Sequence, residues 1–262
     1  MNFFYNFDIG KEIPHFKRMS TDIQSRAESD VVEVIYESFV LPGDQDYFIA
    51  RLLAQKGLHR GFHWAAAQAT EKYLKAFLLM NGVSVLRFKF HPIKKLYDAA
   101  RNVEPDFFAK LDIKPHPKIQ IGADDVYLLT EFTTSGFLQE LESQGSPQNR
   151  YNSSGVKYDP GHLFAMDGLS FKLRDRIGVP QIGESFKGLS PDLLTAFENC
   201  NPWFLGNSAQ SLNEIPTDEF PIQFVSTVTK FEILTKYSNN PAYNIALQWL
   251  RKMMKLPESD RG

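Results

Sequence analysis

The sequence contains a single cysteine, Cys200, among its 262 residues. One thiol cannot form an internal disulfide, and it supplies no cluster of thiolates for a zinc site. No apolar run approaches the roughly 18 residues that a membrane-spanning helix needs. The first residues, MNFFYNFDIGKEIPHFK, lack the basic start and the clean apolar stretch of a secretory signal. We therefore expect a cytoplasmic protein with no membrane segment.

Several sequence motifs of known enzyme classes are also missing. No GxxxxGK phosphate loop, HExxH zinc helix or GxSxG nucleophile elbow occurs, and no period of 20 to 50 residues repeats. His59 and His63 have the i,i+4 spacing of a metal-binding pair, but the sequence places no third ligand near them. Both fall on an apolar helix face, which favours packed, hydrogen-bonded rings. We expect no metal site and no cofactor.

A nearly balanced total charge hides a basic block. The chain has 29 basic and 31 acidic residues, but residues 51–101 contain ten basic residues against two acidic ones, a net charge of +8. The rest of the chain therefore carries 19 basic against 29 acidic residues, a net charge of −10. Such a block favours a polyanion or an acidic partner. Alternatively, these cations solvate helix faces or pair with the acidic segment Glu104–Glu142.

Hydrophobic periodicity predicts an all-α protein. Residues 1–43 fit both helix and strand patterns and stay unassigned, and we expect Pro42-Gly43 to break the chain. A first helix, capped by Asp44 or Asp46, then carries an apolar stripe, namely Phe48, Ile49, Leu52 and Leu53.

The segment Leu58–Met80 consists almost wholly of good helix formers and ends at Asn81-Gly82. At about 100° per residue, one face must be buried; it comprises Ala66, Thr70, Tyr73 and Phe77. The opposite face is expected to form an exposed polar stripe, made of Gln68, Glu71, Lys72 and Lys75.

Three more helices complete a predicted antiparallel bundle. One begins at His91-Pro92, one spans about Ala123–Glu142, and one begins at Asp159-Pro160 and ends before Gly178. The bundle thus covers residues 44–178, with an N-terminal extension at 1–43 and a helical appendage at 179–262 packed on it. Within the appendage, SPDLLTAFENC, Phe220–Leu234 and the segment after Asn240-Pro241 are the expected helices.

The segment QATEKYLKAFLLMNG, then His91 and Leu96, and an Arg150-Tyr151 pair before the last bundle helix resemble the HEPN domain family. The resemblance covers residues 44–178. It implies an up-and-down helical bundle, frequent homodimerisation, and roles connected with RNA or nucleotides. Some members are ribonucleases of toxin–antitoxin or defence systems, and others occur beside nucleotidyltransferase domains.

HEPN ribonucleases carry an Arg and a His, separated by four to six residues, near the start of the last bundle helix. The His can move the proton of a 2′-hydroxyl or of the leaving oxygen, while the Arg offsets charge on the phosphate. Here eleven residues separate Arg150 from His162, and three separate Arg87 from His91. Arg150 can approach His162 only if the loop containing Gly155 folds back. This departure from the family pattern predicts a protein without catalysis.

The leading hypothesis is a homodimer that binds RNA or a nucleotide. The candidate binding residues are polar, basic or aromatic and follow from the helix stripe and the family resemblance: Gln68, Lys72, Lys75, Arg87, Phe88, Lys89, Arg150 and Tyr151. In an alternative arrangement, Phe88 and Phe90 close the end of the bundle while Arg87 and Lys89 face water. The alternative functions are a metal-independent ribonuclease, using Arg150 with His162 or Arg87 with His91, and a module that binds a protein partner.

Overall fold

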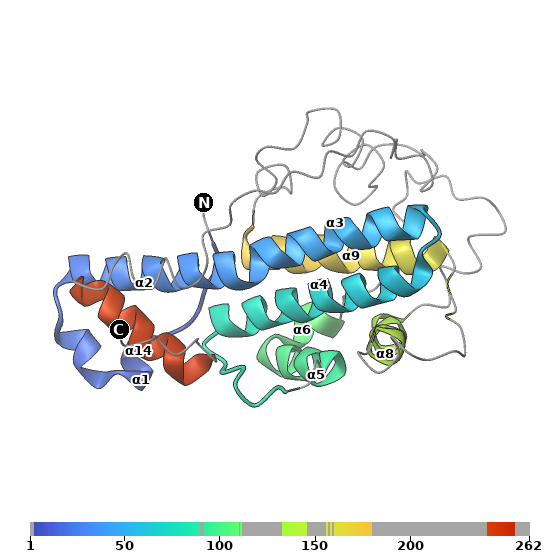
Figure 1. Ribbon diagram of the computed structural model, residues 1–262. Coiled ribbons are helices and arrows are strands. Elements are labelled where there is room, and N and C mark those ends of the chain that lie inside the picture. The colour runs from blue at the N-terminus through green and yellow to red at the C-terminus, as the bar shows by residue number, and fades with distance from the viewer. Residues whose placement is uncertain are drawn as a thin grey trace.

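The computed structural model describes residues 3–89, 92–109, 111, 133–145, 156, 158, 160–179 and 240–254. These residues form helices and no strand, which confirms the all-α prediction (Figure 1). Among the described helices, none combines the length and hydropathy that crossing a bilayer requires. The HEPN-like details of the bundle and the division at residues 43 and 178 stay predictions.

One long helical stretch runs along the molecule. It consists of α2 (Thr21–Ile35), the π-helical turn η2 (Tyr36–Val40) and α3 (Leu41–Gln55), which follow one another directly (Figure 1). The prediction that Pro42-Gly43 breaks the chain is therefore wrong. Proline lacks an N–H, and its ring clashes with the carbonyl four residues earlier in a regular α-helix. The wider π turn lies just before Pro42, where the regular hydrogen-bonding pattern would fail.

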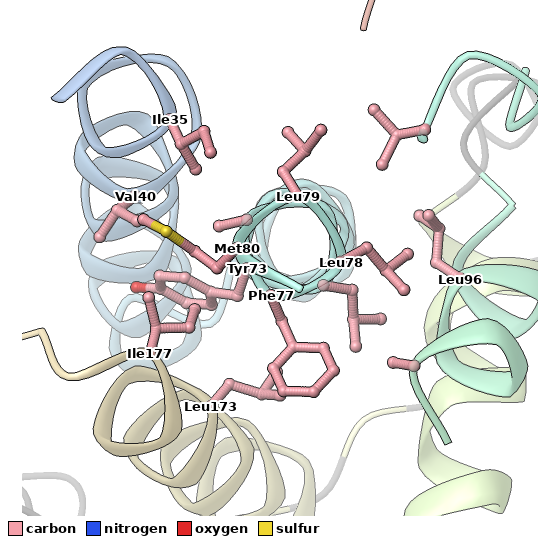
Figure 2. Packing of buried hydrophobic residues seen from close by; sticks show 14 of the residues in the cluster. Ile35, Val40, Tyr73, Phe77, Leu78, Leu79, Met80, Leu96, Leu173 and Ile177 are labelled. Atoms are coloured by element: carbon pink, nitrogen blue, oxygen red, sulfur yellow. The ribbon is translucent and has the colours of Figure 1, made fainter. Parts of the chain in front are cut away.

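Helix α4 (His59–Met80) forms the centre of the bundle, close to its predicted bounds. Gly57, whose φ is +70°, forms the turn that returns the chain from α3. Helices α5 (Ile93–Val103), α8 (Thr134–Gln144) and α9 (Pro160–Ile177) also pack on α4. Figure 2 looks along α4 and shows Val40, Leu96 and Leu173 approaching it from different sides. A helix so enclosed buries side chains on most of its circumference.

Three of the predicted helix starts agree with the structure, whereas the start expected at Asp44 or Asp46 does not, because both residues lie inside α3. α5 begins after Pro92, α9 begins at Pro160, and α14 (Pro241–Met253) begins after Asn240, whose side chain accepts a hydrogen bond from the Ala242 N–H at 2.9 Å. The helix expected at Ala123–Glu142 corresponds in part to α8, and its residues 123–132 lie outside the described residues. The expected helices at SPDLLTAFENC and Phe220–Leu234 also lie outside them.

The two described ends of the chain pack together beside α2. Helix α14 lies on α2 and near α1 (Ile9–Glu12), which continues into the 3₁₀ helix η1 (Pro14–Arg18) (Figure 1). Trp249 of α14 is fully buried, and its ring centroid lies 5.0 Å from that of Phe7. The same core cluster includes residues from Phe7 to Met254. Residues of the predicted extension and appendage therefore share the core of the bundle.

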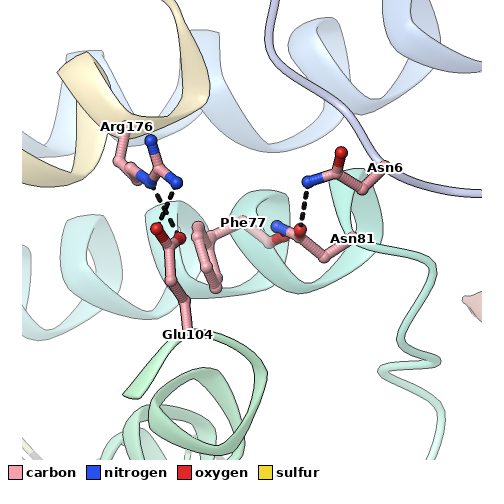
Figure 3. Close-up of polar contacts among 5 residues, drawn as sticks. All are labelled: Asn6, Phe77, Asn81, Glu104 and Arg176. Carbon is pink, nitrogen blue, oxygen red and sulfur yellow. Dashed lines mark hydrogen bonds and ion pairs between the residues drawn. The ribbon is translucent and has the colours of Figure 1, made fainter. Parts of the chain in front are cut away.

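The N-terminal segment also closes the ends of two bundle helices. The Phe4 N–H donates to the Ile177 carbonyl at the end of α9, at 2.9 Å. The Asn6 N–H donates to the Met80 carbonyl at the end of α4, at 2.8 Å. Figure 3 shows the additional side-chain bond from Asn6 to Asn81, at 3.1 Å. The two backbone bonds satisfy carbonyls that have no partner inside their own helices.

Candidate functional site

The polar side of α4 is less open than the sequence suggests. Gln68, Lys72 and Lys75 are half-buried, and Glu71 is only 4% exposed. The prediction that Glu71 faces water is wrong, because neighbouring helices enclose α4. Lys75 lies 2.5 Å from the Glu71 carboxylate, while Lys72 pairs with Asp46 of α3. Both lysine charges are therefore already offset within the protein.

The loop after α4 presents two cations and buries part of an aromatic ring. Arg87 and Lys89 are exposed, whereas Phe88 is partly buried against the hydrophobic core. The Arg87 guanidinium carbon lies 4.9 Å from the centroid of the Phe88 ring, a distance typical of a cation–π contact. This arrangement matches the alternative in which Phe88 packs on the bundle and the cations face water.

This loop is held against the end of α14. The Val85 N–H donates to the Met253 carbonyl at 2.7 Å, and the Ser84 hydroxyl donates to the same carbonyl at 3.0 Å. Within the loop, the Phe88 N–H donates to the Val85 carbonyl at 3.1 Å. Backbone bonds of Val85 and Phe88 therefore hold the loop on either side of Arg87, and Lys89 follows directly after the second of them.

Helix α5 extends this row of exposed cations. Its apolar side is buried and comprises Ile93, Leu96, Tyr97 and Ala100. Lys94, Lys95 and Arg101 are exposed on the other side, together with one acid, Asp98. We call the exposed cations of this stretch the basic segment: Arg87, Lys89, Lys94, Lys95 and Arg101. The α5 cations belong to the basic block of the sequence but were not among the predicted binding residues, although the amphipathic pattern of α5 already predicts their exposure.

The start of α5 is fixed by an acid from another helix. The Lys94 N–H donates to the Glu142 carboxylate of α8 at 2.9 Å. A carboxylate in this position satisfies a free backbone donor and interacts favourably with the positive end of the helix. The orientation of α5, and with it the direction of its lysines, thus depends on α8.

Three described histidines, His59, His63 and His162, gather where α4, α8 and α9 meet. His162 is fully buried, and its Nε2 lies 2.7 Å from the Glu140 carboxylate. Its ring centroid lies 5.1 Å from that of His63, which is also fully buried. His59 stacks on Tyr158 at 4.0 Å. In the part of the chain that the structure describes, no group of three or more His, Cys, Asp or Glu side chains could hold a metal ion.

The burial of His162 limits what it can do chemically. With no exposed surface, its ring offers no direct approach for a substrate phosphate in this conformation. Arg150, Tyr151, His91 and Phe90 lie outside the described residues. The pairs Arg150–His162 and Arg87–His91 therefore stay predictions.

A buried polar network that the sequence analysis missed lies between α3, α4 and α9. It comprises two carboxylates, two guanidinium groups and two phenols, namely Asp44, Asp167, Arg51, Arg174, Tyr47 and Tyr73. The sequence signal was present as polar residues on the buried stripes of α3 and α9. Periodicity alone did not reveal it, because the partners of each ion pair lie more than 100 residues apart.

Comparison with known proteins identifies no relative, since no family model, curated protein or solved structure matches this chain. The resemblance to HEPN domains therefore stays a prediction that depends on the motifs of residues 68–82 and on His91, Arg150 and Tyr151.

Proposed function

We propose that this chain is a HEPN-like homodimer that binds single-stranded RNA without cleaving it. The single observation that supports the proposal is the basic segment, in which five exposed cations on one loop and the following helix accompany only one acid, Asp98. Such a row attracts phosphates and releases the counterions bound to them. The binding surface thus lies beyond α4, on the stretch from Arg87 to Arg101.

The Arg87–Phe88 pair suits a single strand better than a duplex. A cation next to an aromatic ring can contact a phosphate while the ring or the guanidinium plane stacks on a base. Stacking requires bases that are free of their partners, which single strands provide. The half-buried Phe88 also holds Arg87 near the bundle, so that less side-chain freedom is lost on binding.

The environment of His162, the one candidate catalytic histidine that the structure describes, supports the absence of cleavage. General acid–base catalysis requires a ring within hydrogen-bond reach of the substrate. His162 is instead enclosed by Glu140, His63 and Tyr158. A packed ring that holds α8 and α9 together explains these contacts without a catalytic role.

The proposal is tested by measuring RNA binding as a function of salt. We expect the double variant Lys94→Gln/Lys95→Gln to bind a fluorescent single-stranded RNA more weakly. The slope of log K against log salt concentration should become shallower by about 1.4, since each lost phosphate contact to a single strand contributes about 0.7. Fluorescence anisotropy at several salt concentrations measures both quantities.

The matched control is Lys72→Gln/Lys75→Gln, which removes two lysines already paired with acids. We expect its salt slope to match that of the wild type. A salt slope that changes only in this control would show that the binding surface lies on α4 instead. A wild-type protein without measurable affinity for RNA would contradict the proposed function. Degradation of the RNA by the wild type would contradict the non-catalytic part, and a monomer in sedimentation would contradict the homodimer.

A further inference from the structure

Helices α3 and α9 carry the same short pattern of residues. In α3 it is Asp44-x-x-Tyr47-Phe48-x-x-Arg51, and in α9 it is Asp167-x-x-Ser170-Phe171-x-x-Arg174. Positions i, i+3 and i+7 lie on one side of a helix. The six polar side chains at these positions are all at most 2% exposed. Each helix therefore turns an acid, a hydroxyl and a guanidinium towards the interior.

The two copies pair with each other in opposite directions. Arg51 lies 2.5 Å from Asp167, and Arg174 pairs with Asp44. The acid of each copy is thus bound to the arginine of the other, as expected for two equal elements related by a local two-fold axis. Figure 1 shows α3 and α9 side by side.

A tyrosine hydroxyl completes each ion pair. The Tyr47 hydroxyl donates to the Asp167 carboxylate at 2.6 Å. In the α9 copy the equivalent position is Ser170, whose short, buried hydroxyl has no hydrogen-bond partner among the described residues. The missing phenol comes instead from α4, where the Tyr73 hydroxyl donates to the Asp44 carboxylate at 2.7 Å. The second ion pair therefore joins three helices.

The direction of the two copies excludes other packings of α9. Both copies run from Asp to Arg along the chain, so a parallel arrangement would place Asp44 beside Asp167 and the two arginines together. Sliding α9 by one turn in the antiparallel arrangement would move Asp167 away from Arg51 and leave Leu163 or Phe171 in its place. Each alternative leaves buried charges without an opposite partner, which is strongly unfavourable.

We infer that this repeated pattern is a register lock, which selects the antiparallel direction and the register of α9 against α3 and includes α4 through Tyr73. A gain in net stability explains these buried ion pairs less well, because the desolvation of two buried charges offsets much of their attraction. Burial raises the pKa of the Asp167 carboxyl even though Arg51 beside it acts in the opposite direction. A single polar contact that fixes helix register at some expense of stability is known from coiled coils.

The first test exchanges the charges of one pair. We expect Arg51→Asp and Asp167→Arg, each alone, to lower the thermal midpoint by about 10 °C or more, because each places two like charges together in the interior. The double variant Arg51→Asp/Asp167→Arg should recover more than half of that loss. The control exchanges the partly exposed pair Arg176 and Glu104, shown in Figure 3, and should change the midpoint by about 2 °C or less. A double variant whose thermal midpoint is no higher than those of the single variants would contradict the register lock.

The second test replaces the charges by apolar residues. It combines Asp44→Leu, Arg51→Met, Asp167→Leu and Arg174→Met with Tyr47→Phe and Tyr73→Phe, so that neither phenol is left without its carboxylate partner. A register lock predicts a thermal midpoint equal to or above that of the wild type, but several sets of amide resonances for α9. One set of resonances with wild-type contacts between α3 and α9 would show that packing alone fixes the register, and would overturn the inference.

Discussion

At the scale of single residues, the buried phenols of Tyr47 and Tyr73 make the stability of the fold depend on pH in the alkaline range. Burial, together with the neighbouring Asp167 carboxylate, raises the pKa of Tyr47 well above its usual value. Burial and the Asp44 carboxylate do the same to the pKa of Tyr73. Both phenols therefore stay protonated and continue to donate to their carboxylates at a pH where a tyrosine in the unfolded chain ionises.

This difference predicts a loss of stability at high pH. Because the folded-state pKa values are raised, the contribution of these tyrosines is complete below about pH 10 and falls as the pH rises towards the folded values. Each should reduce the free energy of unfolding by about 1.4 kcal/mol per pH unit above pH 10. Urea unfolding at pH 9, 10.5 and 11 measures the slope.

The comparison protein is Tyr47→Phe/Tyr73→Phe, whose stability should depend less steeply on pH over this range. Tyr243, whose pKa burial raises to about 12, remains in both proteins and contributes equally to both slopes. Equal slopes for the two proteins would contradict the assignment of the alkaline loss of stability to Tyr47 and Tyr73. The absolute stability of the variant is not the readout, because removing a donor to a buried carboxylate also destabilises the fold.

The number of cations in the basic block does not show how many of them are exposed and unpaired by acids. Arg51 belongs to the basic block of the sequence, but it is fully buried and paired with Asp167. Lys72 and Lys75 are half-buried and paired as well. Composition gives the number of cations, whereas only the tertiary structure shows which of them have a partner. The cations of the basic segment differ because they are exposed.

At the scale of elements, the end of α8 packs unusually closely on α4. A Cβ added at Gly145 would lie 2.5 Å from the His63 carbonyl oxygen and 2.6 Å from the Ala67 Cβ. Both neighbours belong to the central helix and cannot easily move. The absence of a side chain at Gly145 therefore allows α8 to reach α4, and α8 in turn supplies Glu140 to His162 and Glu142 to the start of α5.

We expect Gly145→Ala to lower the free energy of unfolding by about 1–3 kcal/mol, the usual cost of an added group in a packed interior. Ser143→Ala is the control, since Ser143 is exposed near the same helix end, and its effect should stay within about 0.5 kcal/mol. Chemical denaturation measures both values. Equal stability of the two variants would show that α8 can retreat from α4 without loss.

Element boundaries show a second limit of sequence patterns. Pro42-Gly43 is a strong breaking signal, yet the helical stretch from Thr21 to Gln55 passes through it by means of the π turn. Asp44, expected to cap a new helix, lies inside α3 and is buried against Arg174. Local propensity was overruled because the side chains on both sides of the proline pack into one core.

At the scale of the whole molecule, the N-terminal segment holds together parts that are distant in the chain. Its backbone bonds the ends of α4 and α9, and Phe7 packs on Trp249 of α14. Phe7 is 7% exposed, whereas Phe4, three residues earlier, is 58% exposed. The two phenylalanines therefore offer a matched pair for testing this association.

Phe7→Ala should reduce the free energy of unfolding by about 3–5 kcal/mol, because it removes a buried ring between the two described ends of the chain. Phe4→Ala should change it by no more than about 0.5 kcal/mol. Thermal or urea unfolding of both variants provides the comparison. A similar small effect for both would mean that the N-terminal segment contributes little to the core.

The sequence by itself determined the helical class, the course of α4 and the starts of α5, α9 and α14, because these depend on local periodicity, proline and capping residues. Only the tertiary structure decided that α4 is enclosed, that the helix continues through Pro42, and that Asp44 meets Arg174 across 130 positions of the sequence. Contacts between distant residues arise from packing the helices together, and a local pattern carries no record of which buried charges will become partners.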